Sequence, residues 1–347
     1  ELHPGLSFGM KFGFWLNAQF PPGPIVHQVE ARLKLAKLAH ALGFDSFWAG
    51  QHFLAAPYQM LQPVPLLARV AAEVPGATIG TCILLLPLYP PVLAAEELAT
   101  LDILTGGRLV CGFGLGYRDI ENEALGSPPG ERVGRFEEAL QVVQGLWRGG
   151  RFSFRGRYFR VPECEVTLLP VQRPRPPIWI AANGDRAIRR AARLGDAWII
   201  APHSPIPVIK RQLEVYRQAR QLAGLGPPAA VPIHREVYVA PTEAEAWEHA
   251  ERYIGPKYEA YRQWGQDRAL PADDRFYEDF KALAKDRFII GTPESVREQL
   301  GRFRAELGIT HLLIRSEPPG MPAELAERSL RLLGEKVIPY LAGRAGV

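Results

Sequence analysis

The chain alternates between strand-like and helix-like segments almost from end to end, and this alternation limits its fold more than any other feature. Eight short apolar runs are each followed by a segment whose apolar residues recur at helical spacing, as Val29, Leu33 and Ala36 do. The expected strands span residues 8–16, 44–49, 77–85, 108–113, 178–182, 197–201, 233–239 and 311–315. The expected helices span residues 27–42, 64–74, 92–104, 132–147, 185–194, 207–222, 243–261, 293–307 and 323–341.

Eight strand–helix units predict a closed α/β architecture. Neighbouring parallel strands need long crossover connections, and eight strands that are each followed by a helix close into a (β/α)₈ TIM barrel. An open doubly wound parallel sheet is the structural alternative. A barrel needs about 250 residues and the chain has 347, so we expect a single domain over residues 1–347 with insertions. One is a β-hairpin region near residues 150–176, and the other is a helical insertion near residues 256–288 that would form a lid.

Composition and cysteine usage exclude several classes of function. The net charge is only +4 and the basic residues are scattered among acidic ones, so no nucleic-acid-binding stripe is expected. The most apolar run, Ile83 to Leu86, is stopped by Pro87, far short of the roughly 20 residues that a membrane span needs. The three cysteines form no CxxC pair, and the first ten residues lack a secretory pattern. We therefore expect a cytoplasmic protein with no nucleic-acid or membrane partner.

The residues that follow the expected strands are where a barrel of this kind places its active site. Amides, glycines and histidines are common among them, and these side chains and backbones are typical of binding sites. The set comprises Asn17, Gln19, Gln51, His52, Thr81, Cys82, Ile83, Gly114, Gly116, Tyr117, Asn183, Gly184, Asp185, His203, Arg315 and Glu317.

Two turns in this set have the composition of ligand-binding loops. Residues 112–116 read GFGLG, which is not the GxGxxG dinucleotide motif, because no helix follows directly. These glycines either let a flat or phosphorylated ligand approach the backbone or form a tight turn after the strand. Asn183 and Gly184 precede a helix, whose free N–H groups attract phosphate. The alternative for this second turn is a plain helix cap.

His52 and His203 are the candidate catalytic residues, because each follows a strand end and imidazole titrates near neutral pH. A structural role is the alternative for each. The eight histidines include no HxH or HExxH pair, so no metal site is expected. The chain has no GxxxxGK[ST] loop. A barrel glycoside hydrolase stays open, because its paired carboxylates leave no short motif.

Residues 101–117, with the sequence LDILTGGRLVCGFGLGY, resemble the bacterial luciferase-like family of flavin-dependent monooxygenases. The family pattern reads LDxxSGGRxxxGxGxGY, and Thr105 replaces the usual Ser. Further segments resemble this family in the same order along the chain, namely residues 43–48, 80–87, 132–147, 177–182, 190–198 and 291–294. The resemblance therefore spans nearly the whole chain.

The resemblance implies a TIM barrel that holds reduced FMN or, in one branch, a deazaflavin coenzyme across its strand ends. Cys82 and Ile83 match a non-proline cis peptide behind the flavin ring. Asn183 and Gly184 match the phosphate turn, and Arg132 matches a phosphate-binding arginine. By resemblance we also expect a homodimer and a separate flavin reductase as a partner. The expected cofactor-binding residues are Asn17, Thr81, Cys82, Ile83, Gly114, Gly116, Tyr117, Arg132, Asn183 and Gly184.

Two departures from the luciferase pattern limit the expected activity. Luciferases carry adjacent histidines after the second strand, of which the first is catalytic, whereas here that position is Gln51 and His52 remains. The glycine-rich form near Leu115 replaces a luciferase arginine and also occurs in deazaflavin members. We therefore predict an FMN-dependent monooxygenase that acts on a small organic substrate with reduced flavin and oxygen, without aldehyde light emission. The alternatives are a deazaflavin-dependent hydride-transferring oxidoreductase, a barrel glycoside hydrolase and a non-catalytic flavin-binding protein.

Overall fold

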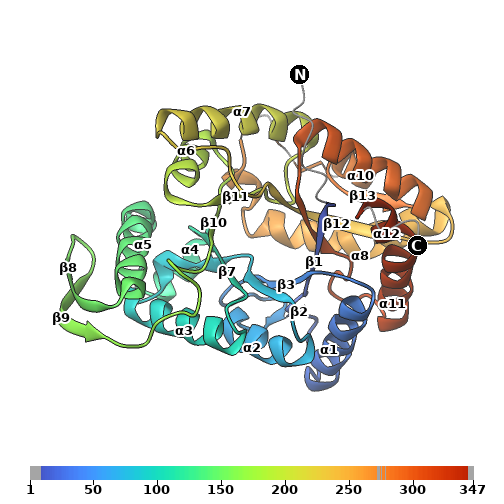
Figure 1. The fold of residues 1–347 in the computed structure, drawn as a ribbon. Helices are drawn as coiled ribbons and strands as arrows, with labels where there is room; N and C mark the ends of the chain where they lie inside the picture. The colour runs from blue at the N-terminus through green and yellow to red at the C-terminus, as the bar shows by residue number, and fades with distance from the viewer. Residues whose placement is uncertain (1–8, 272–273, 275, 278, 343–347) are drawn as a thin grey trace.

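A curled parallel sheet forms the centre of the molecule (Figure 1), as seen in a computed structural model that describes residues 9–271, 274, 276–277 and 279–342. All eight predicted strands are present, and neighbouring strands pair in parallel along the path β11-β10-β7-β5-β3-β1-β14-β12-β13. The eight are β1 (Lys11–Trp15), β3 (Ser46–Ala49), β5 (Thr78–Thr81), β7 (Leu109–Gly114), β10 (Ile178–Ala181), β11 (Ala197–Ile199), β12 (Pro232–Val239) and β14 (His311–Arg315).

The curl of the sheet brings β11 back to β12. An isolated parallel bridge joins Ile200 to Ile233. Two backbone hydrogen bonds accompany it, because Ile200 N donates to Pro232 O and His234 N donates to Ile200 O, each at 3.0 Å. The strand β13 (Ile289–Gly291) was not predicted, and it pairs with the carboxyl-terminal half of β12. The molecule is therefore an α/β fold whose strand ends converge on one rim.

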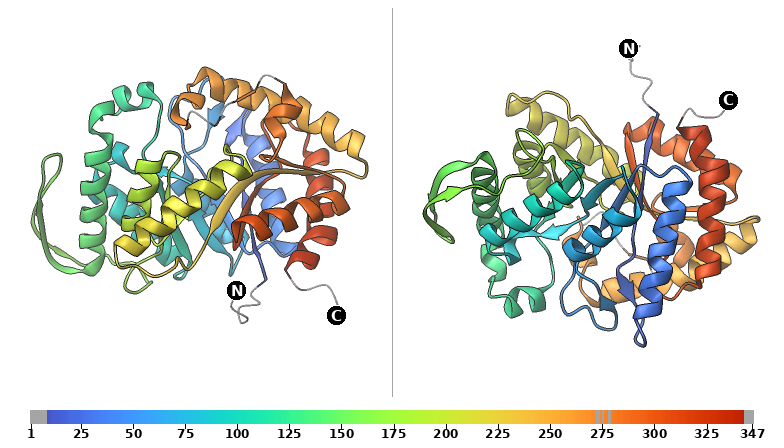
Figure 2. Two further views of the ribbon diagram at one scale, coloured as in Figure 1. Left: turned by 90° about the horizontal axis from the view of Figure 1, so that it is seen from above. Right: turned by 60° about the horizontal axis from the view of Figure 1, so that its bottom comes forward.

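Helices cover the outside of the sheet (Figure 2). Proline occupies the first helical position of α2, α3 and α10, where its missing N–H costs nothing. Among the described residues, no helix combines the length and apolar character needed to cross a membrane. The long helices are α1 (Val26–Ala41), α2 (Pro63–Glu73), α3 (Pro91–Leu104), α5 (Arg132–Arg148), α6 (Asp185–Leu194), α7 (Ile206–Leu222), α8 (Glu243–Gln263), α10 (Pro293–Leu307) and α11 (Ala323–Leu332).

The first predicted insertion is an antiparallel hairpin of β8 (Gly150–Arg155) and β9 (Arg160–Val166), which projects beside α5 in Figure 1. The carboxylate of Glu138 on α5 holds the hairpin turn, because it accepts hydrogen bonds from three consecutive backbone N–H groups over residues 157–159 at 2.7–3.1 Å. The hairpin prediction is confirmed.

The second predicted insertion is in part helical. The helix α8 continues to Gln263, and a 3₁₀ turn (Asp267–Ala269) and α9 (Phe280–Ala284) follow. Residues 272, 273, 275 and 278 of this region lie outside the described residues, as does Phe8 at the start of the first expected strand. The lid function expected of this region stays a prediction.

Three local features differ from the sequence prediction. The expected strand over residues 77–85 is divided into β5 and β6 (Leu84–Leu85), with a cis peptide between Cys82 and Ile83 in the gap. A small antiparallel pair, β2 (Gln19–Phe20) with β4 (Gln59–Met60), forms above the sheet from loop residues. The expected closing helix is interrupted by a π-helical turn (Leu333–Val337) before α12 (Ile338–Leu341).

The inside of the curl is filled by aromatic rings. Trp48 stacks on Trp179 with ring centroids 5.1 Å apart, and both are buried. Gly80 makes room for this pair, because a Cβ at that position would overlap the Trp48 ring. The packed interior supports a cavity at the carboxyl-terminal rim of the strands.

Candidate functional site

A cavity of about 330 Å³ lies where the carboxyl ends of the eight predicted strands converge. Each of these strands contributes to its wall, seven with a last residue or with the loop that follows, and β12 with His234 in its amino-terminal half. The contributions are Trp15 from β1, His52 after β3, Ile83 after β5, Gly114 from β7, Asn183 after β10, His203 after β11, His234 from β12 and Arg315 from β14.

Most of the predicted site residues line this one cavity. They are His52, Cys82, Ile83, Gly114, Gly116, Tyr117, Arg132, Asn183, Gly184 and His203. Asn17 and Thr81 are not among the lining residues, because their side chains are used in the wall. The amide of Asn17 bonds both the N–H and the carbonyl of Gln19 at 3.1 Å. The hydroxyl of Thr81 bonds the backbone of Gly112 twice, at 2.8 and 2.9 Å.

One wall of the cavity is formed by the Cys82–Ile83 peptide and the glycine-rich loop that ends β7. The Cys82–Ile83 peptide is cis, as the family resemblance predicted, and the indole N–H of Trp15 donates to its Cys82 carbonyl at 3.0 Å. Gly114 faces the Ile83 side chain so closely that a Cβ would overlap it. Gly116 has a φ of +76°, which other residues rarely adopt. Glycine is therefore required in this loop both for close packing and for its backbone conformation.

A second wall carries donors suited to phosphate. The helix α6 begins after Gly184 with no side-chain cap, so its first N–H groups have no intrahelical partner. A Cβ at Gly184 would meet no atom within 4 Å, so this turn is open to a ligand. The neighbouring carboxylate of Asp185 is paired with Arg211 at 3.0 Å. Arg132, at the start of α5, lines the same cavity and uses Nη1 to hold Gly116 O at 3.1 Å.

These donors fit the phosphate of a flavin coenzyme. Free N–H groups at a helix N-terminus combined with a guanidinium form a recurring phosphate site. The wall formed by Ile83 and Gly114, where glycine leaves room beside the Ile83 side chain, is where a planar ring could lie. The coenzyme implied by the family resemblance is thus compatible with the residues present.

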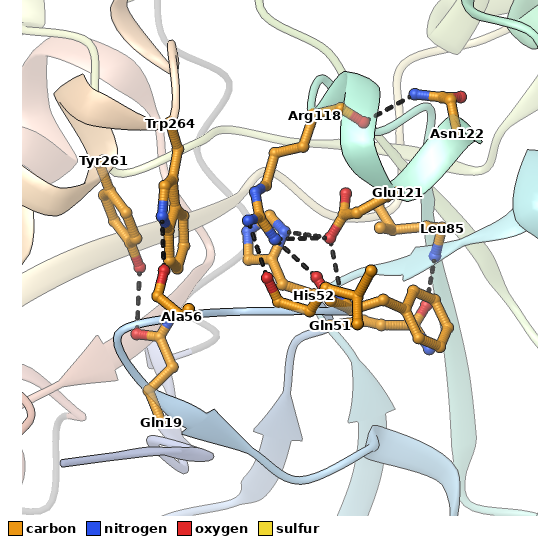
Figure 3. A network of polar contacts seen from close by, with 12 residues as sticks. Gln19, Gln51, His52, Ala56, Leu85, Arg118, Glu121, Asn122, Tyr261 and Trp264 are labelled. Carbon is orange, nitrogen blue, oxygen red and sulfur yellow. Dashed lines mark hydrogen bonds and ion pairs between the residues drawn. The ribbon is translucent and has the colours of Figure 1, made fainter. Parts of the chain in front are cut away.

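His52 is held in place by a buried carboxylate (Figure 3). Its Nδ1 lies 3.0 Å from Oε1 of Glu121, which comes from the short helix α4 (Asp119–Ala124) and is fully buried. The same oxygen accepts from Phe53 N at 2.8 Å and from Arg118 at 3.3 Å. An ionised carboxylate only accepts, so Nδ1 carries the proton and Nε2 is left to accept or, in the imidazolium, to donate.

Arg118 and Trp264 complete the surroundings of His52. The Arg118 guanidinium lies 4.3 Å from the Trp264 ring centroid and donates to Phe53 O and Leu54 O at 2.6 and 3.0 Å. The indole N–H of Trp264 donates to Ala56 O at 3.0 Å, which ties the end of α8 to the loop after β3 (Figure 3).

Gln51 has a structural role here. It accepts from Leu85 N at 2.9 Å and donates to Gln62 and to the Tyr89 hydroxyl at 2.8 and 2.6 Å. All three bonds lie inside the wall, so His52 is the side chain of this pair that is left for a ligand.

A cluster of charged residues lies in the wall formed by β12, β14 and α8, and of its members the sequence analysis singled out Arg315 but not Glu236 or Lys257. The Arg315 guanidinium lies 3.7 Å from the Trp15 ring centroid, and its Nη1 donates to Glu236 and to the Tyr261 hydroxyl, each at 3.2 Å. The ammonium of Lys257 forms an ion pair with the same Glu236 oxygen, and both side chains are buried. Burial, followed by the charge of Arg315, lowers the pKa of Lys257 to about 7.

His203 and His234 lie beside this charged cluster and also line the cavity. Burial, together with the charge of Arg315, lowers the pKa of both imidazoles well below the usual value, so they are neutral at pH 7. Nδ1 of His203 and Nε2 of His234 are buried without a hydrogen-bond partner among the described residues. His203 is thus a polar residue of the wall, and its ring has no carboxylate partner among the described residues.

The missed residues left different traces in the sequence. Arg315 was among the predicted strand-end residues, whereas Glu236 was visible only as a charge inside an expected strand. Glu121 and Lys257 lie on helices rich in charged residues, where the sequence does not distinguish a buried charge from its exposed neighbours. Across the described ranges, no group of three or more His, Cys, Asp or Glu side chains is placed to hold a metal ion.

Comparisons with known proteins identify the family. The family model for luciferase-like monooxygenases matches residues 10–311. The phthiodiolone/phenolphthiodiolone dimycocerosates ketoreductase of Mycobacterium bovis is 28% identical in an alignment that covers 96% of this chain and 97% of the relative. The crystal structure of the monooxygenase RslO1 from Streptomyces bottropensis has a TM-score of 0.82 at 27% identity, covering 95% of this chain and 99% of that one.

Two more distant structures share the fold. The oxygenating constituent of 3,6-diketocamphane monooxygenase from Pseudomonas putida, in complex with FMN, has a TM-score of 0.78 at 20% identity, over 95% of this chain and 98% of that one. An F420-dependent secondary alcohol dehydrogenase has a TM-score of 0.76 at 20% identity with the same coverage. Since the family model covers most of the chain, the protein is an oxidoreductase that belongs to the luciferase-like monooxygenase family.

Proposed function

We propose that this protein is an FMN-dependent monooxygenase that uses reduced flavin and oxygen to oxidise a small organic substrate. The observation that carries the proposal is the layout of one cavity, which has phosphate donors on one wall, the Cys82–Ile83 peptide and the glycine-rich loop on another, and an oriented imidazole at His52. The similarity to a monooxygenase at 27% identity supports it. We infer further that the bridge between Ile200 and Ile233 closes the sheet into the (β/α)₈ barrel.

The residues divide the work of holding such a coenzyme. The N-terminus of α6 at Asn183 and Gly184, together with Arg132, would bind the phosphate. Ile83 and Gly114 would support the ring, and the packed aromatic side chains at the mouth would exclude water. The bound flavin would supply the redox chemistry. His52, with Nδ1 engaged by Glu121, would offer Nε2 for a hydrogen bond or a proton to the reacting group.

A deazaflavin-dependent hydride transfer is the second candidate function. The ketoreductase at 28% identity favours it, because a ketoreductase carries out a reduction. The fold shared with an F420-dependent secondary alcohol dehydrogenase supports this candidate. The phosphate donors of α6 and Arg132 would serve either coenzyme.

Side-by-side titration of FMN, reduced FMN and the deazaflavin coenzyme tests the proposal. We expect reduced FMN to bind most tightly, and Arg132→Gln to weaken its binding by about tenfold, the usual size of one charge-assisted hydrogen bond. Arg331→Gln, on the exposed face of α11, is the control and should leave binding unchanged. Binding of the deazaflavin coenzyme with no binding of FMN in either state would replace the proposal with the second candidate.

Two partners belong to the same proposal. We propose that a separate flavin reductase supplies the reduced FMN and that the protein acts in the cytoplasm as a homodimer. Size-exclusion chromatography with light scattering measures the oligomeric state, and a monomer at micromolar concentration would contradict the dimer.

A further inference from the structure

The wall around Arg315 holds more positive than negative charge. Arg315 and Lys257 both contact Oε1 of Glu236, so two cations share one carboxylate. The nearby carboxylates have partners of their own, because Asp274 pairs with Arg287 and Glu317 pairs with Arg32. Burying an excess charge is costly unless a counter-charge reaches it.

Polar atoms without a partner accompany this excess charge. Among the described residues, Nε of Arg315, Nδ1 of His203 and Nε2 of His234 are buried without a hydrogen bond. All three side chains line the cavity and are more than nine-tenths buried. Unsatisfied buried polar atoms are rare in folded proteins and often mark a ligand position. The Arg315 guanidinium donates to Glu236 and to the Tyr261 hydroxyl through Nη1, so the edge that carries Nε is left to bond a ligand.

The lowered pKa of Lys257 has the same electrostatic origin. Burial is its main cause, and repulsion from Arg315 adds to it, while Glu236 opposes both. Tyr258 and Tyr261 from the same helix also face this group, as do the neutral rings of His203 and His234. A negative charge at Arg315 would relieve the repulsion and keep Lys257 protonated.

We propose that the wall around Arg315 binds a carboxylate of the substrate, and thus that the enzyme acts on an organic acid. This rests on the proposed function for the same cavity and names its substrate class. The guanidinium can grip a carboxylate with two parallel hydrogen bonds. The apolar side chains of Trp15, Met60 and Ile199 line the same cavity and would contact the body of the acid. The proposal thus assigns Arg315 to the substrate carboxylate, and Arg132 and the start of α6 to the phosphate of the coenzyme.

The test uses the coenzyme-free chain and two matched probes, benzoate and its neutral analogue benzamide. Calorimetric titration should show benzoate binding about tenfold or more tightly than benzamide, the effect expected of a charged hydrogen-bonded pair. Arg315→Gln should abolish this preference and leave FMN binding within about twofold, while Arg331→Gln changes neither. Equal affinity for the two probes would overturn the proposal, as would loss of the preference in Arg132→Gln.

A second variant gives a change of the opposite sign. Glu236→Gln removes the carboxylate that competes with the ligand, so benzoate should raise its melting temperature more than it raises that of the unchanged protein. The same or a smaller rise would contradict the proposal. Weaker FMN binding in folded Arg315→Gln would assign Arg315 to the coenzyme instead. If benzoate binds as expected but FMN does not bind the unchanged protein, the carboxylate site stands and the FMN proposal alone fails.

Discussion

Glu121 is the residue on which the geometry of His52 depends. Its buried carboxylate is shared by the His52 ring, the Phe53 N–H and the Arg118 guanidinium. We predict that Glu121→Gln lowers the free energy of unfolding by about 3 kcal/mol, because Arg118 then keeps a buried charge without its counter-charge. Urea unfolding measures the difference. Glu123→Gln, exposed on the same short helix, should change stability by less than about 0.5 kcal/mol. Equal effects of the two would show that Glu121 holds nothing in place.

Lys257 gives the stability a defined pH dependence. Its pKa is lowered from 10.5 to about 7 in the folded protein, mainly by burial, while the unfolded chain keeps the ordinary value. Above pH 7 the unfolded state therefore binds more protons than the native state, so this group makes stability rise with pH.

Lys257→Met removes that dependence and leaves Glu236 paired with Arg315. We predict that, between pH 7 and 9, the unchanged protein gains stability relative to the variant, by at most about 1.4 kcal/mol per pH unit. Below the folded-state pKa the difference should be constant, because both states are then protonated. Unfolding free energies measured at each pH provide the comparison, and parallel curves across the range would contradict the assignment.

At the scale of elements, Asp102 explains the motif that carried the family resemblance. It lies buried near the end of α3 and accepts hydrogen bonds from Val171 N at 2.7 Å, Gln172 N at 3.0 Å and Gln172 Nε2 at 2.7 Å. The proline-rich segment that leads into β10 is thereby fastened to the start of β7. The motif therefore serves the framework of the site, and only its glycine-rich end reaches the cavity.

Asp102→Asn tests this role. The side-chain amide of Asn would place its own N–H groups against the N–H donors of Val171 and Gln172. We therefore predict a loss of about 2 kcal/mol in the free energy of unfolding. The matched control is Glu96→Gln, which is exposed on the same helix. Chemical unfolding of the two variants in parallel measures the difference. An unchanged free energy of unfolding in Asp102→Asn would show that Asp102 does not stabilise the framework.

The long elements could be predicted because their patterns are repeated and strong. The amphipathic helix over residues 132–147 and the apolar strand over residues 108–113 agree with α5 and β7 to within one residue. Short elements could not, since β2, β4 and β13 have only two or three residues and form because other parts of the chain offer them partners. The π-helical turn after α11 likewise has no periodic signal.

At the scale of the whole molecule, the meeting of the strand ends at one rim could be predicted from the sequence. The pairing of Lys257 with Glu236 in the wall formed by β12, β14 and α8 could not. Strand ends gather at one rim whatever the side chains are, so His52, Asn183 and His203 could be placed together from strand order alone. Lys257 reaches the same cavity wall from a helix, and its partner Glu236 sits inside a strand. Their meeting depends on how α8 packs across the sheet, which no local pattern encodes.

The contact between Trp264 and the loop after β3 gives the enzyme a natural optical reporter. The indole lies 5.4 Å from the His52 ring and 4.3 Å from the Arg118 charge, measured from its ring centroid. Indole emission responds to nearby charge and to hydration, so occupancy at His52 should alter the fluorescence of Trp264. Arrival and departure of a compound could then be timed by stopped-flow without any label, with Trp264→Phe supplying the background from the remaining six indoles.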